Sequence, residues 1–186
     1  VKRLVKNERN AIIGVVCHPE LLTERIIIGN KVVITTGGYA YSNGQNQYLK
    51  EYVPHLSSVP TTNGDTSTGS GLDLLKSVGG KLVNMTSVQL HPTGFVDPEN
   101  PKAMTKSLAP EALRGVGGRL VNHSGLRFAD ELSTRDRLVN EIQQNCLDAQ
   151  AILILDQKMV GAYSMTFINF YLSKKLFQKV TSIEEL

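Results

Sequence analysis

Short apolar runs separated by polar turns make up most of the first forty residues. Ala11–Cys17 is a nearly continuous apolar run, which is typical of a buried strand. Arg25–Ile28 and Lys31–Thr35 are two further short runs, and Gly29-Asn30 between them predicts a tight turn. We therefore expect two or three short strands, the last of which leads directly into Thr36-Gly37-Gly38.

Two later segments carry helical periodicity. Leu72, Leu75 and Val78 share one face of a segment that ends at Gly79-Gly80, which predicts a helix stopped by the glycines. Glu131–Asp148 predicts a charge-rich helix with a thin apolar line formed by Leu138, Ile142 and Cys146.

The remaining chain alternates between strand-like and turn-like pieces. The second half of Lys81–His91 alternates polar and apolar residues, which predicts a strand that ends at Pro92. Ser42–Pro54 has a weak helical periodicity, and Met165–Leu186 predicts a helical tail. Two more short strands are predicted at Gly118–Asn122 and Ala151–Asp156.

Composition limits the class of protein. The 186 residues are 41% apolar and 20% charged, as in an ordinary globular protein with one large domain or two pieces of domain. A net charge of +3 without a basic stripe argues against nucleic acid as a partner. No apolar run approaches a membrane span, and the N-terminus lacks a secretory pattern. Two distant cysteines form no metal-binding cluster, so a soluble intracellular protein is expected.

Five arginines lie in or beside the stretch Glu111–Asp136. A guanidinium matches a carboxylate with two parallel hydrogen bonds, so such a stretch suits a site for a small dianion. A structural ion-pair network is the alternative. The five are Arg114, Arg119, Arg127, Arg135 and Arg137.

Two glycine-rich loops and one histidine are the other candidate features. A Gly-Gly turn follows the Lys31–Thr35 strand, and the loop Pro60–Gly71 opens onto a helix, whose N-terminus favours an anion. A plain turn and a flexible connector are the alternatives, because neither loop matches a nucleotide-binding fingerprint. His91 lies at a predicted strand end, where it either projects into a site or makes a structural hydrogen bond.

Five segments in order resemble one family, the flavoprotein subunits of fumarate reductases and succinate dehydrogenases. The resemblance covers about residues 11 to 180 and is greatest to the soluble, single-chain fumarate reductases of eukaryotic microbes. It is carried by Val32–Tyr39, Thr61–Gly71, Gln89–Pro98, Leu108–Gly118 and Arg127–Asp136.

The resemblance implies an FAD-dependent oxidoreductase that transfers a hydride to fumarate and forms succinate. It implies that Arg135 donates the proton, that Arg114 and Glu111 form a relay behind it, and that His91 and Thr93 bind the substrate. The implied FAD contacts are Thr36, Gly37, Gly38, Thr68, Gly69, Ser70 and Gly71.

The implied fold is α/β or α+β. Residues 1–80 would be the later part of a Rossmann-like FAD-binding domain, 81–110 a connection with the substrate-site strand, and 111–186 most of a capping domain. The family's N-terminal G-x-G-x-x-G unit and its C-terminal region are absent, so the chain is expected to be the central part of a longer enzyme. Ser70 stands where the family usually has Asp, and Pro110 where several relatives have Thr.

Other functions stay open from the sequence. A truncated, non-catalytic remnant or binding module is one alternative. A sister enzyme, such as an L-aspartate oxidase or a succinate dehydrogenase flavoprotein, is another. The electron donor, for which NADH or a reduced flavin would serve, and the compartment, cytoplasm or organelle lumen, are not fixed.

Overall fold

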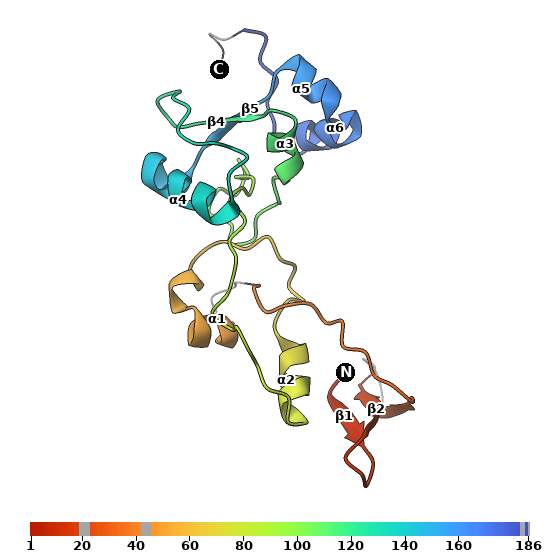
Figure 1. Ribbon diagram of the computed structural model, residues 1–186. Helices are drawn as coiled ribbons and strands as arrows, with labels where there is room; N and C mark the ends of the chain where they lie inside the picture. The colour runs from red at the N-terminus through yellow and green to blue at the C-terminus, as the bar shows by residue number, and fades with distance from the viewer. Residues whose placement is uncertain (19–22, 42–45, 183–184, 186) are drawn as a thin grey trace. The chain divides into compact units, whose positions relative to one another are not determined.

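The computed structural model describes residues 1–18, 23–41, 46–182 and 185. The chain divides into two compact units, unit 1 (Val1–Val88) and unit 2 (Gln89–Leu186). Figure 1 shows helices and short strands in both units, so the prediction of a mixed α and β fold is confirmed.

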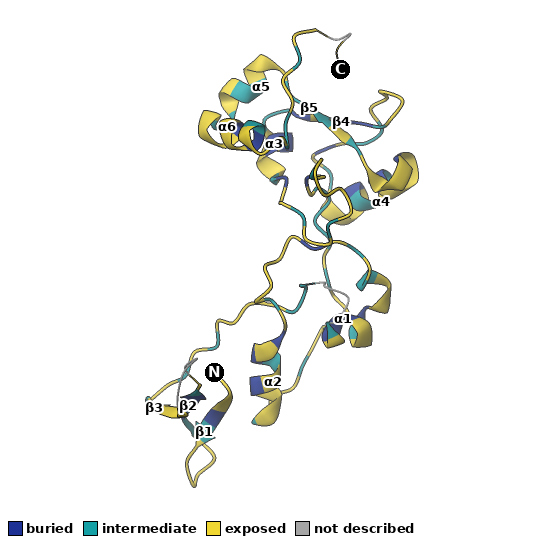
Figure 2. Cartoon of the chain, turned by 180° about the vertical axis from the view of Figure 1, so that it is seen from behind, coloured by how far each residue is buried: buried dark blue, intermediate teal, exposed yellow. Residues whose placement is uncertain are grey.

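Unit 1 begins with a three-stranded antiparallel sheet in the order β1-β2-β3. The strands are β1 (Arg3–Lys6), β2 (Ile12–Cys17) and β3 (Arg25–Ile28). Val16 on the central strand is fully buried, whereas every residue of β3 is exposed, as Figure 2 shows. The predicted strands at Ala11–Cys17 and Arg25–Ile28 are therefore confirmed.

Two other predicted strands are wrong. Neither Lys31–Thr35 nor the second half of Lys81–His91 belongs to a ladder in the described part of the chain. Alternation favours an extended backbone, but a strand also requires a neighbour whose N–H and C=O groups pair with it. The described residues supply no such neighbour to either segment.

The helices of unit 1 are α1 (Gln47–Tyr52), the short 3-10 helix η1 (Pro54–Leu56) and α2 (Ser70–Ser77). Asn46 caps α1, because its side-chain oxygen accepts a hydrogen bond from the Leu49 amide at 3.1 Å. The helical periodicity of Ser42–Pro54 is thus confirmed from Gln47 to Tyr52, while residues 42–45 lie outside the described residues.

The buried face of α2 differs from the face that the sequence suggested. Gly71 and Leu74 are buried, whereas Leu75 is exposed. The close approach of Gly71 to Thr36 fixes this rotation, since a residue three positions later lies on the same face. The predicted end is confirmed, because the helix stops at Ser77 and Gly79 adopts a φ of 93°.

Gly71→Ala is expected to destabilise unit 1. A Cβ at this position would lie 1.8 Å from Thr36 Oγ1 and 2.9 Å from Thr36 Cβ, so α2 would have to move away. We expect the free energy of unfolding to fall by about 1–3 kcal/mol, measured by urea denaturation. Gly64→Ala is the matched control, because nothing lies within 4 Å of a Cβ there. Equal stability of the two variants would contradict the packing of α2 against Thr36.

Unit 2 is built around a two-stranded antiparallel ribbon in which Leu120 pairs with Leu153. Figure 1 shows α4 on one side of the ribbon and α5 and α6 on the other. The elements are α3 (Glu111–Gly115), β4 (Arg119–Val121), α4 (Arg135–Asn145), η2 (Leu147–Ala149), β5 (Ile152–Ile154), α5 (Gln157–Ala162) and α6 (Met165–Ser173).

Two apolar clusters hold this unit together. The first joins α3 and α6 to the segment around Phe95, and its buried members are Phe95, Ala109, Leu113, Ile168 and Tyr171. The second joins α4 to the ribbon, and its buried members are Leu120, Leu138, Ile142 and Cys146. The predicted strands at Gly118–Asn122 and Ala151–Asp156, and the apolar line of α4, are confirmed.

The boundaries of two predicted helices are wrong. The helix expected from Glu131 begins at Arg135, because the Ser133 amide and hydroxyl both hydrogen-bond the Asp130 carbonyl and form a turn. The helical tail ends at Ser173 rather than continuing toward Leu186, and residues 183, 184 and 186 lie outside the described residues. Within the described ranges, no helix has both the length and the apolar character needed to cross a membrane.

Candidate functional site

Two hydrogen bonds between Thr93 and Ala109 bring the turn after His91 beside the start of α3. The Ala109 amide donates to the Thr93 carbonyl at 3.2 Å, and the Thr93 hydroxyl donates to the Ala109 carbonyl at 2.9 Å. Glu111 lies two residues beyond Ala109, so these bonds place it close to His91. The hydroxyl proton of Thr93 is engaged within the unit.

The turn also orients the His91 ring. Its Nδ1 lies 3.0 Å from the Thr93 carbonyl oxygen and 3.3 Å from the Thr93 amide, so a ring protonated at Nε2 accepts from that amide and leaves its Nε2–H for another partner. Burial lowers the pKa of His91, and the charges of Arg114 and Arg135 lower it further, against the opposing effects of the Thr93 carbonyl and Glu111. His91 therefore lies within electrostatic reach of all three candidate relay residues.

Arg135 lies at the first position of α4 and has two side-chain partners. Its Nη2 donates to Glu111 Oε2 at 3.1 Å, and its Nη1 donates to Gln89 Oε1 at 2.8 Å. The side chain is still 45% exposed, so the guanidinium is held on two sides and open on another. The hydrogen bond and the charge of Arg135 lower the pKa of Glu111, which is therefore an anion at neutral pH.

Arg114 is buried, in contrast to Arg135. It lies in the last turn of α3 and is 3% exposed. Its Nη1 donates to the main-chain carbonyl of Glu131 at 2.6 Å, while Nε and Nη2 are buried without a partner among the described residues. Burial lowers the pKa of Arg114, and the charge of Arg135 adds to that effect, so this guanidinium gives up a proton more easily than a solvated one.

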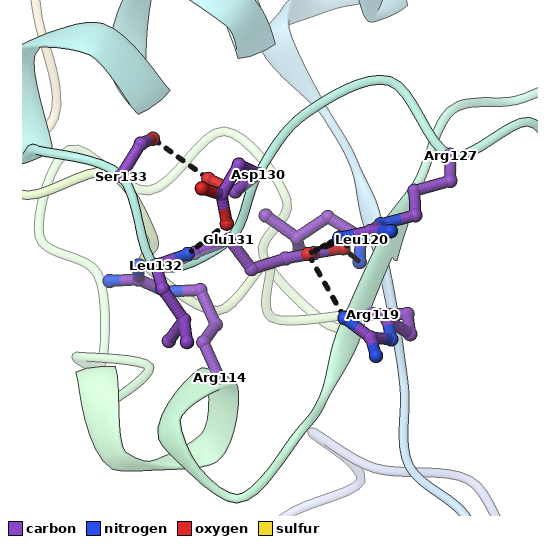
Figure 3. Close-up of polar contacts among 8 residues, drawn as sticks. All are labelled: Arg114, Arg119, Leu120, Arg127, Asp130, Glu131, Leu132 and Ser133. Atoms are coloured by element: carbon purple, nitrogen blue, oxygen red, sulfur yellow. Dashed lines mark hydrogen bonds and ion pairs between the residues drawn. The ribbon is translucent and has the colours of Figure 1, made fainter.

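Glu131 is a buried carboxylate held by several donors, as Figure 3 shows. Arg127 approaches with two nitrogens, Nη2 at 2.7 Å from Oε2 and Nε at 3.1 Å from Oε1. The Leu120 amide donates to Oε1 at 3.0 Å, and Arg119 Nη1 lies 3.5 Å from Oε2. Burial alone would raise the pKa of Glu131, but Arg127 and the Leu120 amide outweigh it and lower the pKa to about 2.

The depressed pKa of Glu131 predicts a loss of stability in acid. A carboxyl group whose pKa falls from 4.5 when unfolded to about 2 when folded stabilises the fold above pH 4.5, and this contribution disappears as the pH falls through that window. We expect the free energy of unfolding to drop by on the order of 3 kcal/mol, seen in urea denaturation curves recorded from about pH 6 downward. Glu131→Gln should remove this part of the acid dependence, and an unchanged dependence would contradict the assignment.

The candidate FAD contacts lie together in unit 1. The Gly69 amide donates to the Gly38 carbonyl at 3.2 Å, which joins the Thr36–Gly38 turn to the loop that precedes α2. Gly37 and Gly69 adopt φ values of 75° and 87°, which a glycine accommodates without strain. Nothing lies within 4 Å of a Cβ built on Gly38, so a ligand has access to its backbone.

An aromatic cluster supports this pair of loops. The ring of Tyr48 lies against Gly69, where a Cβ would approach to 2.7 Å, and it contacts the rings of Tyr39 and Tyr52. The Tyr48 hydroxyl donates to Asp73 in α2 at 2.6 Å, and the Tyr39 hydroxyl donates to the Met85 carbonyl. The loop and the helix N-terminus are therefore held in fixed positions by groups distant in sequence.

The candidates thus form two groups, each within one unit. His91, Thr93, Glu111, Arg114 and Arg135 lie together in unit 2, and the candidate FAD contacts lie together in unit 1. Sequence reasoning missed Gln89 and Glu131. The sequence could have indicated Gln89, because it lies two residues before His91 and its side-chain oxygen can accept a hydrogen bond from a guanidinium. The indication for Glu131 is weaker, since it is one carboxylate among several arginines.

Comparisons with known proteins give a consistent picture. A family model described as an FAD binding domain matches residues 1–185. The chain is 40% identical over 179 residues to Fumarate reductase 1 of Saccharomyces cerevisiae, covering 94% of the chain and 37% of that protein. It is 43% identical over 153 residues to Fumarate reductase of Schizosaccharomyces pombe, covering 82% of the chain and 29% of that protein.

A solved structure is similar as well. The open conformation of a flavocytochrome c3 fumarate reductase superposes with a TM-score of 0.63 and 28% sequence identity, covering 94% of this chain and 29% of the other. The chain therefore spans about a third of the length of the proteins it resembles.

Proposed function

The chain belongs to the FAD binding domain family, and from this premise we propose that it is the central part of an FAD-dependent fumarate reductase that converts fumarate to succinate. The observation that carries the proposal is Arg135, which Glu111 and Gln89 hold in the same unit as His91. The similarity of the chain to the fumarate reductases of two yeasts supports the choice of reaction.

In this proposal, unit 1 contains the later part of a Rossmann-like FAD-binding domain, and unit 2 contains the His91 turn and most of a capping domain. Residues 1–80 hold the cofactor. Residues 81–110 connect the two domains and carry the His91 turn, and residues 111–186 carry the proton-donating Arg135. The joined glycine loops and the fixed N-terminus of α2 suit FAD, because they offer accessible backbone and a positive helix end. Thr36, Gly37, Gly38 and Thr68–Gly71 would hold it.

Bound reduced FAD supplies a hydride to one alkene carbon of fumarate. In the tautomer protonated at Nε2, His91 donates from Nε2 to one substrate carboxylate, while Nδ1 accepts from the Thr93 amide and the Thr93–Ala109 hydrogen bonds hold the turn in place. Arg135 donates a proton to the second alkene carbon, on which negative charge develops. A free guanidinium is a poor acid with a pKa of at least about 12, but a developing carbanion is basic enough to accept its proton. The cation also stabilises the charge as it forms.

Glu111 and Arg114 return the proton to Arg135. Glu111 already accepts a hydrogen bond from Arg135, so its carboxylate can pass a proton to a neutral guanidine without a large movement. Arg114 lies three residues after Glu111 in α3 and interacts with it electrostatically, and its lowered pKa suits it to supply that proton. Each turnover thus adds one hydride and one proton to fumarate, and a proton from solvent recharges Arg114, so that all three residues return to their starting protonation states.

The test uses the full-length protein that carries this chain. We expect the purified protein to show flavin absorbance and to oxidise reduced methyl viologen only when fumarate is present. A protein without flavin would favour the non-catalytic remnant. A flavoprotein that oxidises L-aspartate but does not reduce fumarate would favour the sister enzyme, and either outcome would overturn the proposal.

A further inference from the structure

The buried carboxylate of Glu131 connects three parts of unit 2. It accepts hydrogen bonds from the Leu120 amide on β4 and from Arg127, and Arg119 adds a longer contact. Both carboxylate oxygens are engaged, and the side chain is only 2% exposed. The hydrogen bond from the Leu120 amide therefore holds the carboxylate against β4, and Figure 3 shows the side chains around it.

The main chain of the same residue holds Arg114. The Glu131 carbonyl accepts the 2.6 Å hydrogen bond from Arg114 Nη1, and the structure gives the other two guanidinium nitrogens no acceptor among the described residues. Among the described residues, the Glu131 carbonyl is therefore the hydrogen-bond acceptor that orients the buried Arg114 guanidinium. The Glu131 side chain, which the Leu120 amide holds to β4, restrains the segment that carries that acceptor.

The residues after Glu131 lead directly to Arg135. The turn at Asp130–Ser133 is closed by the Leu132 amide, which donates to Asp130 Oδ1 at 3.1 Å, and by the two bonds from Ser133 to the Asp130 carbonyl. Thr134 then precedes the first residue of α4. The segment anchored by Glu131 therefore begins the helix that carries Arg135 and also contributes the carbonyl that binds Arg114.

We propose that Glu131 is a positioning residue of the proton relay: its buried carboxylate, anchored to β4 and Arg127, fixes the main-chain carbonyl that holds Arg114, which shares α3 with Glu111. The inference rests on the proposed function for its catalytic consequence, but its geometric part does not. A purely stabilising ion pair would have no reason to affect proton delivery more than substrate binding or flavin content.

The test compares two variants of the full-length, FAD-loaded protein. Glu131→Gln keeps the size of the side chain and an acceptor for the Leu120 amide but removes the charge that holds Arg127. Arg119→Gln is the matched control, because Arg119 is 51% exposed and contacts the same carboxylate at the longer distance of 3.5 Å. We expect kcat to fall by about tenfold in Glu131→Gln, with KM for fumarate within about twofold and flavin content unchanged. Arg119→Gln should stay within about twofold of the wild type.

The solvent isotope effect separates positioning from stability. If proton return to Arg135 becomes slow, the ratio of kcat in H2O to kcat in D2O should rise in Glu131→Gln and stay at the wild-type value in Arg119→Gln. A Glu131→Gln enzyme with a lower melting temperature but wild-type kcat and isotope effect would overturn the inference. If that variant fails to fold, Arg127→Gln keeps the Glu131 carboxylate but removes one of its anchors, so kcat should again fall. A wild-type kcat in Arg127→Gln would also overturn the inference.

A crystal structure of Glu131→Gln gives a readout that does not depend on activity. We expect the Arg114 guanidinium to shift away from the residue 131 carbonyl, and an unmoved Arg114 would overturn the inference even in an active enzyme. If the wild-type protein reduces no fumarate, the proposed function fails, while a displaced Arg114 would still support the positioning role.

Discussion

Arg135→Ala is expected to lower kcat for fumarate reduction by about 10²- to 10⁴-fold in the full-length protein, because the variant lacks the proton donor and the cation beside the reacting carbon. Flavin content should not change, since Arg135 lies in unit 2 and the FAD contacts are assigned to unit 1. The measurement is steady-state fumarate reduction together with the flavin-to-protein absorbance ratio.

Arg137→Ala is the control for this variant. Arg137 is an exposed arginine on the same helix, two residues further on, and it has no role in the proposed site. Its removal changes the net charge of α4 by the same amount, so a near-normal rate in Arg137→Ala separates the effect of position from that of charge. Turnover by Arg135→Ala close to the wild-type rate would remove Arg135 from the acid role.

Glu111→Gln is expected to have the second largest effect on the rate. Glutamine keeps an oxygen that can accept the hydrogen bond from Arg135 Nη2, now 3.1 Å from Glu111 Oε2, but it cannot take up and release a proton. Arg135 should therefore stay in place while its reprotonation slows. We expect kcat to fall by about 10- to 10²-fold with little change in KM, measured by steady-state kinetics in H2O and D2O.

Glu99→Gln serves as the comparison for the carboxylate. Glu99 is also exposed and also pairs with a cation, Lys175 at 2.9 Å, but it lies outside the group of candidate site residues. The Glu99→Gln variant should reduce fumarate with the wild-type kcat. A Glu111→Gln enzyme with a wild-type kcat would show that protons reach Arg135 by another route, whereas a raised KM with unchanged kcat would assign Glu111 to substrate binding alone.

Sequence periodicity correctly predicted the strands and helices that pair or pack with another element of the described chain. The apolar run at β2 includes two buried residues, and Leu138, Ile142 and Cys146 of α4 are buried, because each element packs against a neighbour that is present. The run at β5 pairs with β4, and its Leu153 is partly buried against the same cluster as α4. Lys31–Thr35 has an equally strong pattern, but the residues that the structure describes offer it no neighbouring strand to pair with. Strand formation depends on such pairing, which a local pattern does not contain.

The arginines illustrate what sequence reasoning could resolve at the site. All five had the same chemistry in the sequence, and only the resemblance to a family separated Arg114 and Arg135 from the rest. The structure places Arg119 and Arg127 against Glu131, as expected of structural ion pairs. It also shows that Arg114 is buried and Arg135 half exposed, a difference that results from tertiary packing. The roles of Gln89 and Glu131 depend on the same long-range contacts.

The most direct test of the proposed mechanism is a single-turnover experiment on the pre-reduced full-length protein. Wild-type protein and Arg135→Ala are mixed anaerobically with fumarate, and flavin reoxidation is followed by absorbance. The account predicts that the wild-type flavin is reoxidised with formation of one succinate per flavin, while the flavin of Arg135→Ala stays reduced on the same timescale. Equal rates of reoxidation in the two proteins, or a wild-type flavin that fumarate leaves reduced, would contradict it.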